Sequence, residues 1–250
     1  MKIIISPAKK MQVDNDILEV RELPVFLEKA EFLMNYLRSL SYEEAKKLWN
    51  CNEQIATLNY ERLKSMDLRR NLTPALLAYQ GIQYQYMAPA VLEDGQWEYV
   101  QNHVCILSGF YGMVRPLDGV VPYRLEMQAK VKLPDVKDLY EYWGDLLYKE
   151  MTRETDIILN LASKEYSKCI EKYVSDKVQF VTCVFGEYNE DHKIIEKGTY
   201  AKMARGEMVR YMAENRIEDL EEIKKYDRLG YRYVQDASDE KKIVFVKKDK

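Results

Sequence analysis

Short runs of apolar residues along the chain predict the strands of a sheet that is covered on both faces. Such runs occur at residues 2–6, 103–107, 156–162 and 177–185. Continuous apolar character, rather than strict alternation, is typical of central strands packed between two layers of helices. Pro7 is expected to end the first strand and Gly186 the last. Near the C-terminus, residues 232–234 and 242–246 flank a polar loop at 235–241, which predicts a hairpin.

Between these runs, apolar residues three and four positions apart predict helices. The expected helices are 24–39, 42–49, one opened by Asn50 or Asn52 and ending near Ser65, 75–79, 138–151, 200–215 and 218–225. Ser41, with Glu44 three residues later, has the pattern of a capping box. Thr73-Pro74 has the pattern of a cap followed by a first-turn proline, and Thr199 is expected to cap the helix at 200–215.

The alternation of strands and helices predicts an α/β (α+β) fold: a central, mostly buried mixed sheet flanked by helices. The chain has 250 residues, of which 47% are hydrophobic and 12% aromatic, enough to bury a large core without a disulfide or a structural metal. No repeat and no Ser/Gly-rich linker separates two cores. We therefore expect a single compact domain over residues 1–250.

Charge and motif content exclude several classes of protein. The net charge is −3, so any attraction to polyanions must come from local clusters of cations. No apolar stretch has the length of a membrane helix or of a signal-peptide core, and a soluble cytoplasmic protein without membrane association is expected. The four cysteines and two histidines have no metal-ligand spacing, so no metal and no cofactor are expected. Phosphate-loop, dinucleotide-binding, nucleophile-elbow and zinc-helix motifs are absent from the sequence.

Polar and cationic residues follow three of the predicted strands, at residues 6–10, 107–118 and 160–166. The side chains of interest there are Ser6, Lys9, Lys10, Arg115, Asn160, Ser163 and Lys164. Strand ends are where α/β sheets place their ligands, and turn amides beside a cation suit a phosphate or a carboxylate. Turns that carry solvated charges are the alternative interpretation.

The loop that follows the second of these strands is rich in arginine and carboxylate side chains. Arg115 and Arg124 can each grip a phosphate with two donors. Asp118 and Glu126 are close enough in sequence to orient these arginines, or to act as proton acceptors in catalysis. An arginine–carboxylate network that only orders the loop is the alternative.

Two further cations, Lys202 and Arg205, lie one turn apart on the helix expected at 200–215, beside Gly206. A helical glycine is unfavourable, so it indicates the close approach of another backbone or of a ligand, or a kink. Convergence of the cations from all these segments would make one basic cleft for a polyanion or a phosphorylated metabolite.

Five strings of residues resemble the YaaA peroxide-stress family of bacteria. They are IIISPAK at 3–9, LSGFYGMVRPLDGVVPYRLEM at 107–127, DLYEYWGD at 138–145, NLASKEY at 160–166 and AKMARG at 201–206. The resemblance implies a cytoplasmic protein that hydrogen peroxide induces and that limits unincorporated iron. It also implies DNA binding through a positively charged cleft and a helix-hairpin-helix element in an unusual α/β fold.

The family's polar motif positions correspond in this chain to Ser6, Lys9, Arg115, Asp118, Tyr123, Arg124, Asn160, Ser163, Lys202 and Arg205. The helix-hairpin-helix would lie within residues 41–65. Its junction reads Trp49-Asn50-Cys51-Asn52, without the glycine that close approach to a phosphate favours. A pair of helices that serves packing alone is the alternative.

These observations lead to two functional hypotheses. The first is a stress protein that binds double-stranded DNA, or a phosphorylated small molecule, with little sequence preference, and that affects iron damage indirectly. The alternative is an enzyme that acts on a nucleotide, a nucleobase or damaged DNA, with Asp118 or Glu126 as its acid or base.

Overall fold

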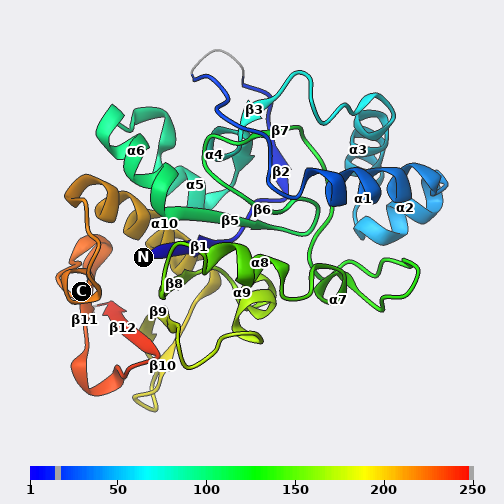
Figure 1. The fold of residues 1–250 in the computed structure, drawn as a ribbon. Coiled ribbons are helices and arrows are strands. Elements are labelled where there is room, and N and C mark those ends of the chain that lie inside the picture. Colours follow the sequence, from blue (N-terminus) through cyan, green and yellow to red (C-terminus); the bar gives the residue numbers. More distant parts are fainter. Residues whose placement is uncertain (15–17, 248–250) are drawn as a thin grey trace.

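A mixed sheet forms the centre of the protein, and the structure, a computed structural model, describes residues 1–14 and 18–247. Its strand order is β11-β12-β9-β8-β1-β5-β6, with β10 paired to β9 (Figure 1). The strands are β1 (Lys2–Ile5), β5 (Val104–Ser108), β6 (Gly112–Val114), β8 (Ile157–Leu161), β9 (Gln179–Tyr188), β10 (Ile194–Ile195), β11 (Tyr231–Tyr233) and β12 (Lys242–Lys247). Strands β5, β1, β8, β9 and β12 are parallel, whereas β6 and β11 are antiparallel at the two edges. The predicted fold class and the C-terminal hairpin are confirmed.

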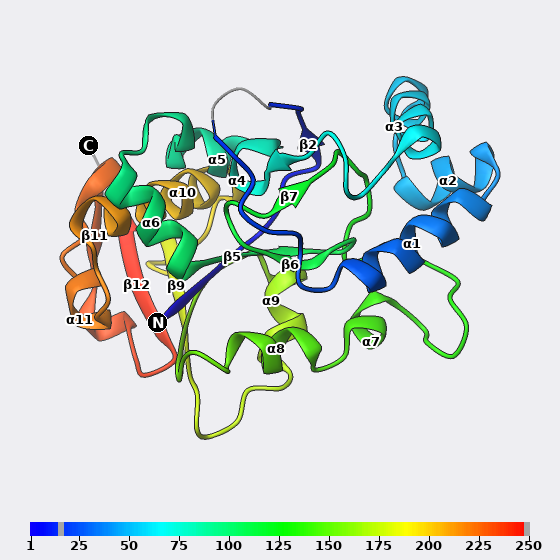
Figure 2. The same cartoon turned by 45° about the horizontal axis from the view of Figure 1, so that its top comes forward.

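Helices cover both faces of this sheet, as its apolar strands require. The side chains of Ile3, Ile4 and Ile5 on the central strand β1 are completely buried. Helices α5, α6 and α10 lie on one side, α8 and α9 on the other, and α1 to α3 form a group beside the sheet (Figure 2). The helices are α1 (Leu27–Ser39), α2 (Tyr42–Trp49), α3 (Glu53–Ser65), α4 (Ala75–Ala78), α5 (Ile82–Met87), α6 (Asp94–His103), α7 (Leu139–Trp143), α8 (Leu146–Met151), α9 (Lys164–Glu171), α10 (Gly198–Asn215) and α11 (Leu220–Ile223), with short 3₁₀ turns at Pro89–Val91, Arg228–Gly230 and Gln235–Ala237.

Helices α2 and α3 begin at the capping residues that the sequence predicts. Ser41 and Glu44 form a complete capping box at the start of α2, and the Asn52 side chain accepts the N–H of Ile55 at the start of α3. Asn50 ends α2 in the left-handed conformation, at a φ of +43°. Asparagine tolerates this conformation better than most residues, so the junction turns without a glycine.

Two predicted elements differ from expectation at a glycine. The helix expected at 138–151 is broken into α7 and α8, because Gly144 adopts a positive φ of +51° that ends the first helix. The strand expected to stop before Gly186 continues through it to Tyr188. Pairing with β10 extends the strand there, since Ile194 lies opposite Tyr188 and Ile195 opposite Glu187.

Three further expectations about local structure were wrong. Thr73 is not a cap and Pro74 is not a first-turn residue: the two form strand β3, which pairs with β7 (Gly119–Val120), and Pro74 is itself the N-cap of α4. A second small sheet joins β2 (Lys10–Met11) to β4 (Tyr79–Gln80). His103 ends helix α6 instead of opening strand β5. Thr199 lies inside α10, whose N-cap is Lys197. For Thr73-Pro74, pairing with β7 outweighed the local signal.

Across residues 1–14 and 18–247, every helix is too short or too polar to cross a lipid bilayer.

Candidate functional site

A cavity of about 380 Å³ lies at the carboxyl ends of β1 and β8; we call it the strand-end cavity. It is lined by the Ser6–Lys9 segment, the start of α5, residues 123–126, the start of α9 and one face of α10. Strand β1 pairs with β5 on one side and with β8 on the other, so the chain connections diverge at this point. In open α/β sheets, such a switch point is the usual place for a ligand.

Two serines join the strand ends at the floor of the strand-end cavity. The Ser163 N–H donates to the Ser6 Oγ atom at 2.8 Å, and the two hydroxyl oxygens are 3.2 Å apart. The Tyr84 hydroxyl donates to the Ser6 carbonyl oxygen at 2.9 Å. These hydrogen bonds fix the turn after β1 against the start of α9.

Two arginines from distant segments bring recessed guanidinium groups to this cavity. The Arg124 side chain is 10% exposed and that of Arg205 is 14% exposed. Each places one Nη2 atom 3.2 Å from a carboxylate oxygen, of Glu126 and Glu196 respectively. The Nε atoms of both arginines are buried and have no hydrogen-bond partner among the described residues. A buried donor without an acceptor is unfavourable, and a bound anion would supply the missing acceptor.

A third donor without a partner in the described part of the chain, the Nε2 atom of Gln83, belongs to another buried side chain of the same cavity. Gln83 and Arg205 are brought together by the packing of α5 against α10. A Cβ atom on Gly206 would overlap the carbonyl oxygen of Gln83, so only glycine permits this approach. Of the three explanations considered for Gly206, the close approach of another backbone is confirmed.

Two exposed lysines and two carboxylates complete the charges of the cavity. Lys9 is 2.6 Å from Glu126, and the side chain of Lys202 reaches the lining from α10. Glu165 is half-buried, and its Oε1 atom accepts the Gln128 N–H at 3.3 Å. Burial, reinforced by the charge of Glu126, raises the pKa of Glu165 above its ordinary value. With both carboxylates ionised, the four cations leave the cavity with a net positive charge.

Tyr123 lines the cavity but does not present a free hydroxyl group to it. Its hydroxyl lies 2.6 Å from the Ser108 Oγ atom and 2.8 Å from the Tyr79 hydroxyl, in a buried chain of hydrogen bonds. Burial raises the pKa of Tyr123 to about 12. The residue therefore positions the segment that carries Arg124.

The structure brings together some of the residues expected at the site and separates others. Those in the cavity are Ser6, Lys9, Tyr123, Arg124, Glu126, Ser163, Lys202 and Arg205. Those outside its lining are Lys10, Arg115, Asp118, Asn160 and Lys164.

Four of the separated residues have other contacts. Lys10 lies on β2 and faces a neighbouring groove. Arg115 lies 3.8 Å from Glu22 and 3.7 Å from Glu154, and its N–H donates to the Oδ2 atom of buried Asp118 at 2.8 Å. Asn160 bonds within the sheet, to the Thr182 hydroxyl and the Ala162 N–H. The sequence predicted that all these cations would meet in one basic cleft. In the structure only four of them line the strand-end cavity.

Gln83 and Glu165 were not predicted from the sequence. Glu165 follows Lys164 directly, and because successive helical residues point about 100° apart, only one of the two faces the cavity. No sequence pattern around Gln83 indicates a functional role. The only indication in the sequence is Gly206, a helical glycine that predicts the close approach of another backbone.

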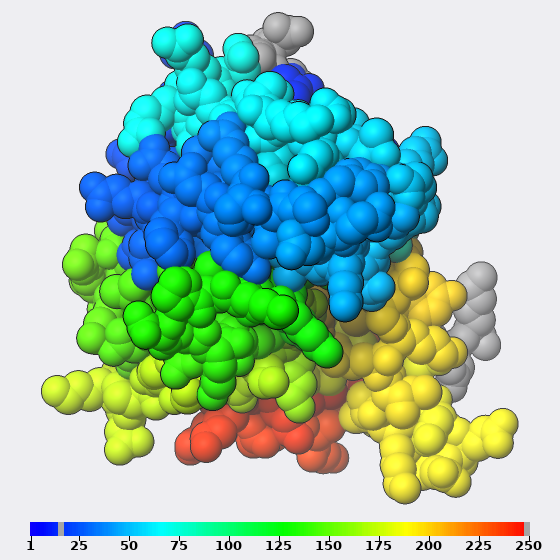
Figure 3. Space-filling model, turned by 90° about the vertical axis from the view of Figure 1, so that its right-hand side faces the viewer, coloured from blue at the N-terminus to red at the C-terminus, as the bar shows by residue number. Residues whose placement is uncertain are grey.

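A second hollow, which we call the α2 groove, adjoins the cavity. It has a volume of about 790 Å³, and Arg124 and Glu126 line both spaces. Its walls are α2 with the Asn50 junction on one side and residues 128–132 on the other, and it carries exposed Lys47, Lys130 and Lys132. Figure 3 shows this face, which is hollowed where the blue N-terminal helices, the green segment after β7 and the gold helix α10 meet.

Metal-ligating side chains are not gathered at this site. Among residues 1–14 and 18–247, no group of three or more His, Cys, Asp or Glu side chains is placed to hold a metal ion. Cys105, Cys169 and Cys183 are buried, and burial raises the pKa of each thiol.

The fold and the cavity define a class: α/β proteins with a cationic pocket at the switch point of a mostly parallel sheet. The sequence profile described as peroxide stress protein YaaA matches residues 1–237, and the chain belongs to that family. It is 64% identical over 99% of its length to a UPF0246 protein of Lachnoclostridium phytofermentans, of which it covers 96%. It is also 59% identical to a UPF0246 protein of Desulfitobacterium hafniense and 58% identical to one of Agathobacter rectalis, over 99% of the chain and at least 98% of each relative. The family resemblance noted in the sequence is confirmed.

Proposed function

We propose that this protein binds double-stranded DNA during peroxide stress, and that the strand-end cavity receives a phosphate of the nucleic acid. The observation that carries the proposal is the pair of recessed arginines, Arg124 and Arg205, each with a buried Nε donor that has no acceptor within residues 1–14 and 18–247. A guanidinium group binds phosphate with two parallel hydrogen bonds, which would satisfy such donors.

The α2 groove supports a path for the DNA backbone up to the cavity. Lys47, Lys130 and Lys132 are exposed along it, and Arg124 lies where the two spaces meet. The Asn50 junction between α2 and α3 also lies on this groove, in the place where a helix-hairpin-helix would contact phosphates. Lysines that contact phosphates confer affinity without reading bases, so we expect low sequence specificity.

Membership of a peroxide-stress family links this binding to damage limitation. A protein that covers DNA reduces the access of hydroxyl radicals, which iron generates from hydrogen peroxide beside the nucleic acid. We propose that the protein affects iron-dependent damage in this indirect way.

Fluorescence anisotropy with two short duplexes of unrelated sequence tests the proposal. The wild type should bind both duplexes alike, and its affinity should fall steeply as salt is raised. Arg124→Ala and Arg205→Ala should each weaken binding by about tenfold, the loss of one charge-assisted hydrogen bond, and lower the salt slope by about one.

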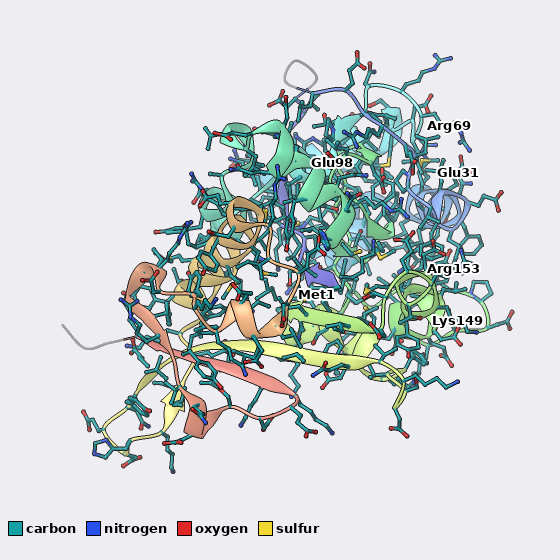
Figure 4. The ribbon with its side chains drawn as sticks, turned by 60° about the vertical axis from the view of Figure 1, so that its left-hand side comes forward. Met1, Glu31, Arg69, Glu98, Lys149 and Arg153 are labelled. Carbon is teal, nitrogen blue, oxygen red and sulfur yellow. The ribbon has the colours of Figure 1, made fainter. Side chains whose placement is uncertain are left out.

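Arg153→Ala is the matched control. Its side chain is 71% exposed, pairs with Glu150 at 2.6 Å, and lies near Lys149 on α8 (Figure 4). Equal losses in Arg124→Ala and Arg153→Ala, or affinity that does not change with salt, would refute a role for the cavity in DNA binding.

The second candidate function is enzymatic action on a nucleotide, a nucleobase or damaged DNA. The observation in its favour is Glu165, a half-buried carboxyl group in the cavity whose pKa is raised by burial, a shift that is typical of a general acid. Incubation with nucleotides and lesion-containing oligonucleotides, followed by chromatography, tests it. A product that forms with the wild type and not with Glu165→Gln would support it, whereas no product across the panel would remove it.

A further inference from the structure

We infer that the strand-end cavity is specific for a phosphate monoester at the end of a chain, carried by a DNA terminus or by a free nucleotide. Binding of a DNA terminus rests on the proposed DNA-binding function, whereas binding of a free nucleotide does not depend on it. The inference follows from the depth, the charge and the hydrogen-bonding capacity of the cavity.

The depth of the arginines favours a group with a single attachment. Arg124 and Arg205 are 10% and 14% exposed, whereas the outer cation Lys9 is 65% exposed. A phosphodiester inside a strand has a nucleotide on both sides, so its chain must enter and leave any site that it occupies. A terminal phosphate has one substituent and reaches recessed donors without bringing a second strand segment into the cavity.

The charge of the cavity fits a dianion better than a monoanion. Lys9, Arg124, Lys202 and Arg205 face two lining carboxylates, Glu126 and Glu165. Glu196, which lies outside the lining, pairs with Arg205, so the surplus is one positive charge. A positively charged cavity attracts a phosphate monoester, which carries about −1.5 to −2 near neutral pH, more strongly than a monoanion. A phosphodiester carries only a single negative charge.

The hydrogen-bond donors around the cavity suit a group with several terminal oxygens. Gln83 and the two arginines each have a buried donor without a partner in the described part of the chain. Ser163 is the N-cap of α9, and its side chain accepts no N–H of that helix in the described part of the chain, so the positive end of the helix lies beside the cavity. A monoester presents three terminal oxygens, against two on a diester.

The chemistry of peroxide damage supplies such a ligand. Radical attack on deoxyribose breaks DNA strands and leaves phosphate monoesters at the ends of the break. A cavity that recognises these ends would direct a DNA-binding stress protein to damaged positions, because intact duplex offers only diesters.

The test compares the wild type on matched probes by fluorescence anisotropy. The probes are a duplex with 5′-phosphate ends, one with 3′-phosphate ends, one with hydroxyl ends, and a closed dumbbell without ends. Deoxyadenosine 5′-monophosphate, deoxyadenosine and inorganic phosphate serve as competitors. We expect at least one phosphorylated duplex to bind about tenfold more tightly than the hydroxyl duplex and the dumbbell, the effect of one added charge-assisted hydrogen bond.

Variants then locate the preference. Arg205→Lys keeps the charge but loses the planar fork, so the preference for phosphate ends should disappear while general binding persists. Lys47→Ala in the α2 groove should weaken binding to all four duplexes by the same factor. Thermal melting of each variant checks that it is folded, and the comparison of wild-type probes stands without any variant.

The outcomes separate this inference from the proposed function. Equal affinity for all four duplexes, with no difference between the nucleotide and the nucleoside as competitors, would overturn the inference and leave DNA binding intact. Binding of the nucleotide without binding of any duplex would overturn the proposed function and support the inference for free nucleotides. Competition by inorganic phosphate as strong as by the nucleotide would show an anion site without selection for an organic monoester, against the inference.

Discussion

Replacement of Asp118 by asparagine should make the protein more stable at pH 8 and change how its stability depends on pH. The Asp118 side chain is 3% exposed, and one carboxylate oxygen, Oδ1, has no partner among the described residues. The other oxygen accepts the Arg115 N–H at 2.8 Å. Burial is the largest influence and raises the pKa of Asp118 from 3.8 to about 7; the Arg115 contacts oppose the rise, and the charge of Glu22 adds to it.

The magnitude follows from the difference between the folded and unfolded pKa values. The folded state binds more protons than the unfolded state between pH 3.8 and about 7, so the Asp118 contribution to stability falls as pH rises through this window. At 1.36 kcal/mol per pH unit, the whole fall is roughly 4 kcal/mol. An asparagine amide avoids the buried charge, but its NH₂ group would lack an acceptor, which costs about 1–3 kcal/mol. The net gain at pH 8 is therefore roughly 1–3 kcal/mol.

Thermal unfolding of both proteins at a series of pH values measures this effect. For a chain of this size, each kcal/mol corresponds to about 2–4 °C in melting temperature. Asp118→Asn should melt above the wild type at pH 8, and the advantage should vanish toward pH 5. Because other titrating groups are shared, the difference between the two proteins isolates Asp118. A difference in melting temperature that stays constant from pH 5 to pH 8 would refute the reasoning.

Three further changes test other parts of the structure. Gly206→Ala should destabilise the fold by about 1–3 kcal/mol through overlap with the Gln83 carbonyl group; an unchanged melting temperature would contradict this packing. Ser41→Ala removes the capping box of α2 and should lower the free energy of unfolding by about 1 kcal/mol in urea, with an unchanged m-value. Binding of hydroxyl-ended duplex should tighten as pH falls through the raised pKa of Glu165, since the cavity loses a negative charge. Glu165→Gln should abolish this pH dependence in anisotropy titrations. Equal pH dependence of the affinity in the wild type and the variant would count against a role for Glu165.

The sequence predicted most of the elements because their signals are local. The apolar strand at residues 2–6 and the capping box of Ser41 and Glu44 depend on neighbouring positions, and both were confirmed. Two of the errors arose where a distant partner overrode the local preference. Thr73-Pro74 pairs with β7, and Gly186 stays within a strand because β10 extends β9.

The amino-acid sequence alone determined which residue types were available for an anion site and at which strand ends they lie. Ser6, Lys9 and Ser163 were identified in this way, because polar residues after apolar strands gather at one edge of a parallel sheet. The order of the strands in the sheet cannot be predicted from the local patterns of the sequence. The position of β1 between β5 and β8 was therefore known only from the structure.

Only the tertiary structure decided which cations meet. Arg124 and Arg205 share a cavity because the segment at 123–126 and helix α10 both line it, whereas Arg115 pairs with Glu22 and Glu154 elsewhere on the molecule. The direction of a side chain depends on strand alternation, helix phase and long-range contacts at once. A difference of one residue, as between Lys164 and Glu165, is therefore enough to place one charge in the site and its neighbour outside it.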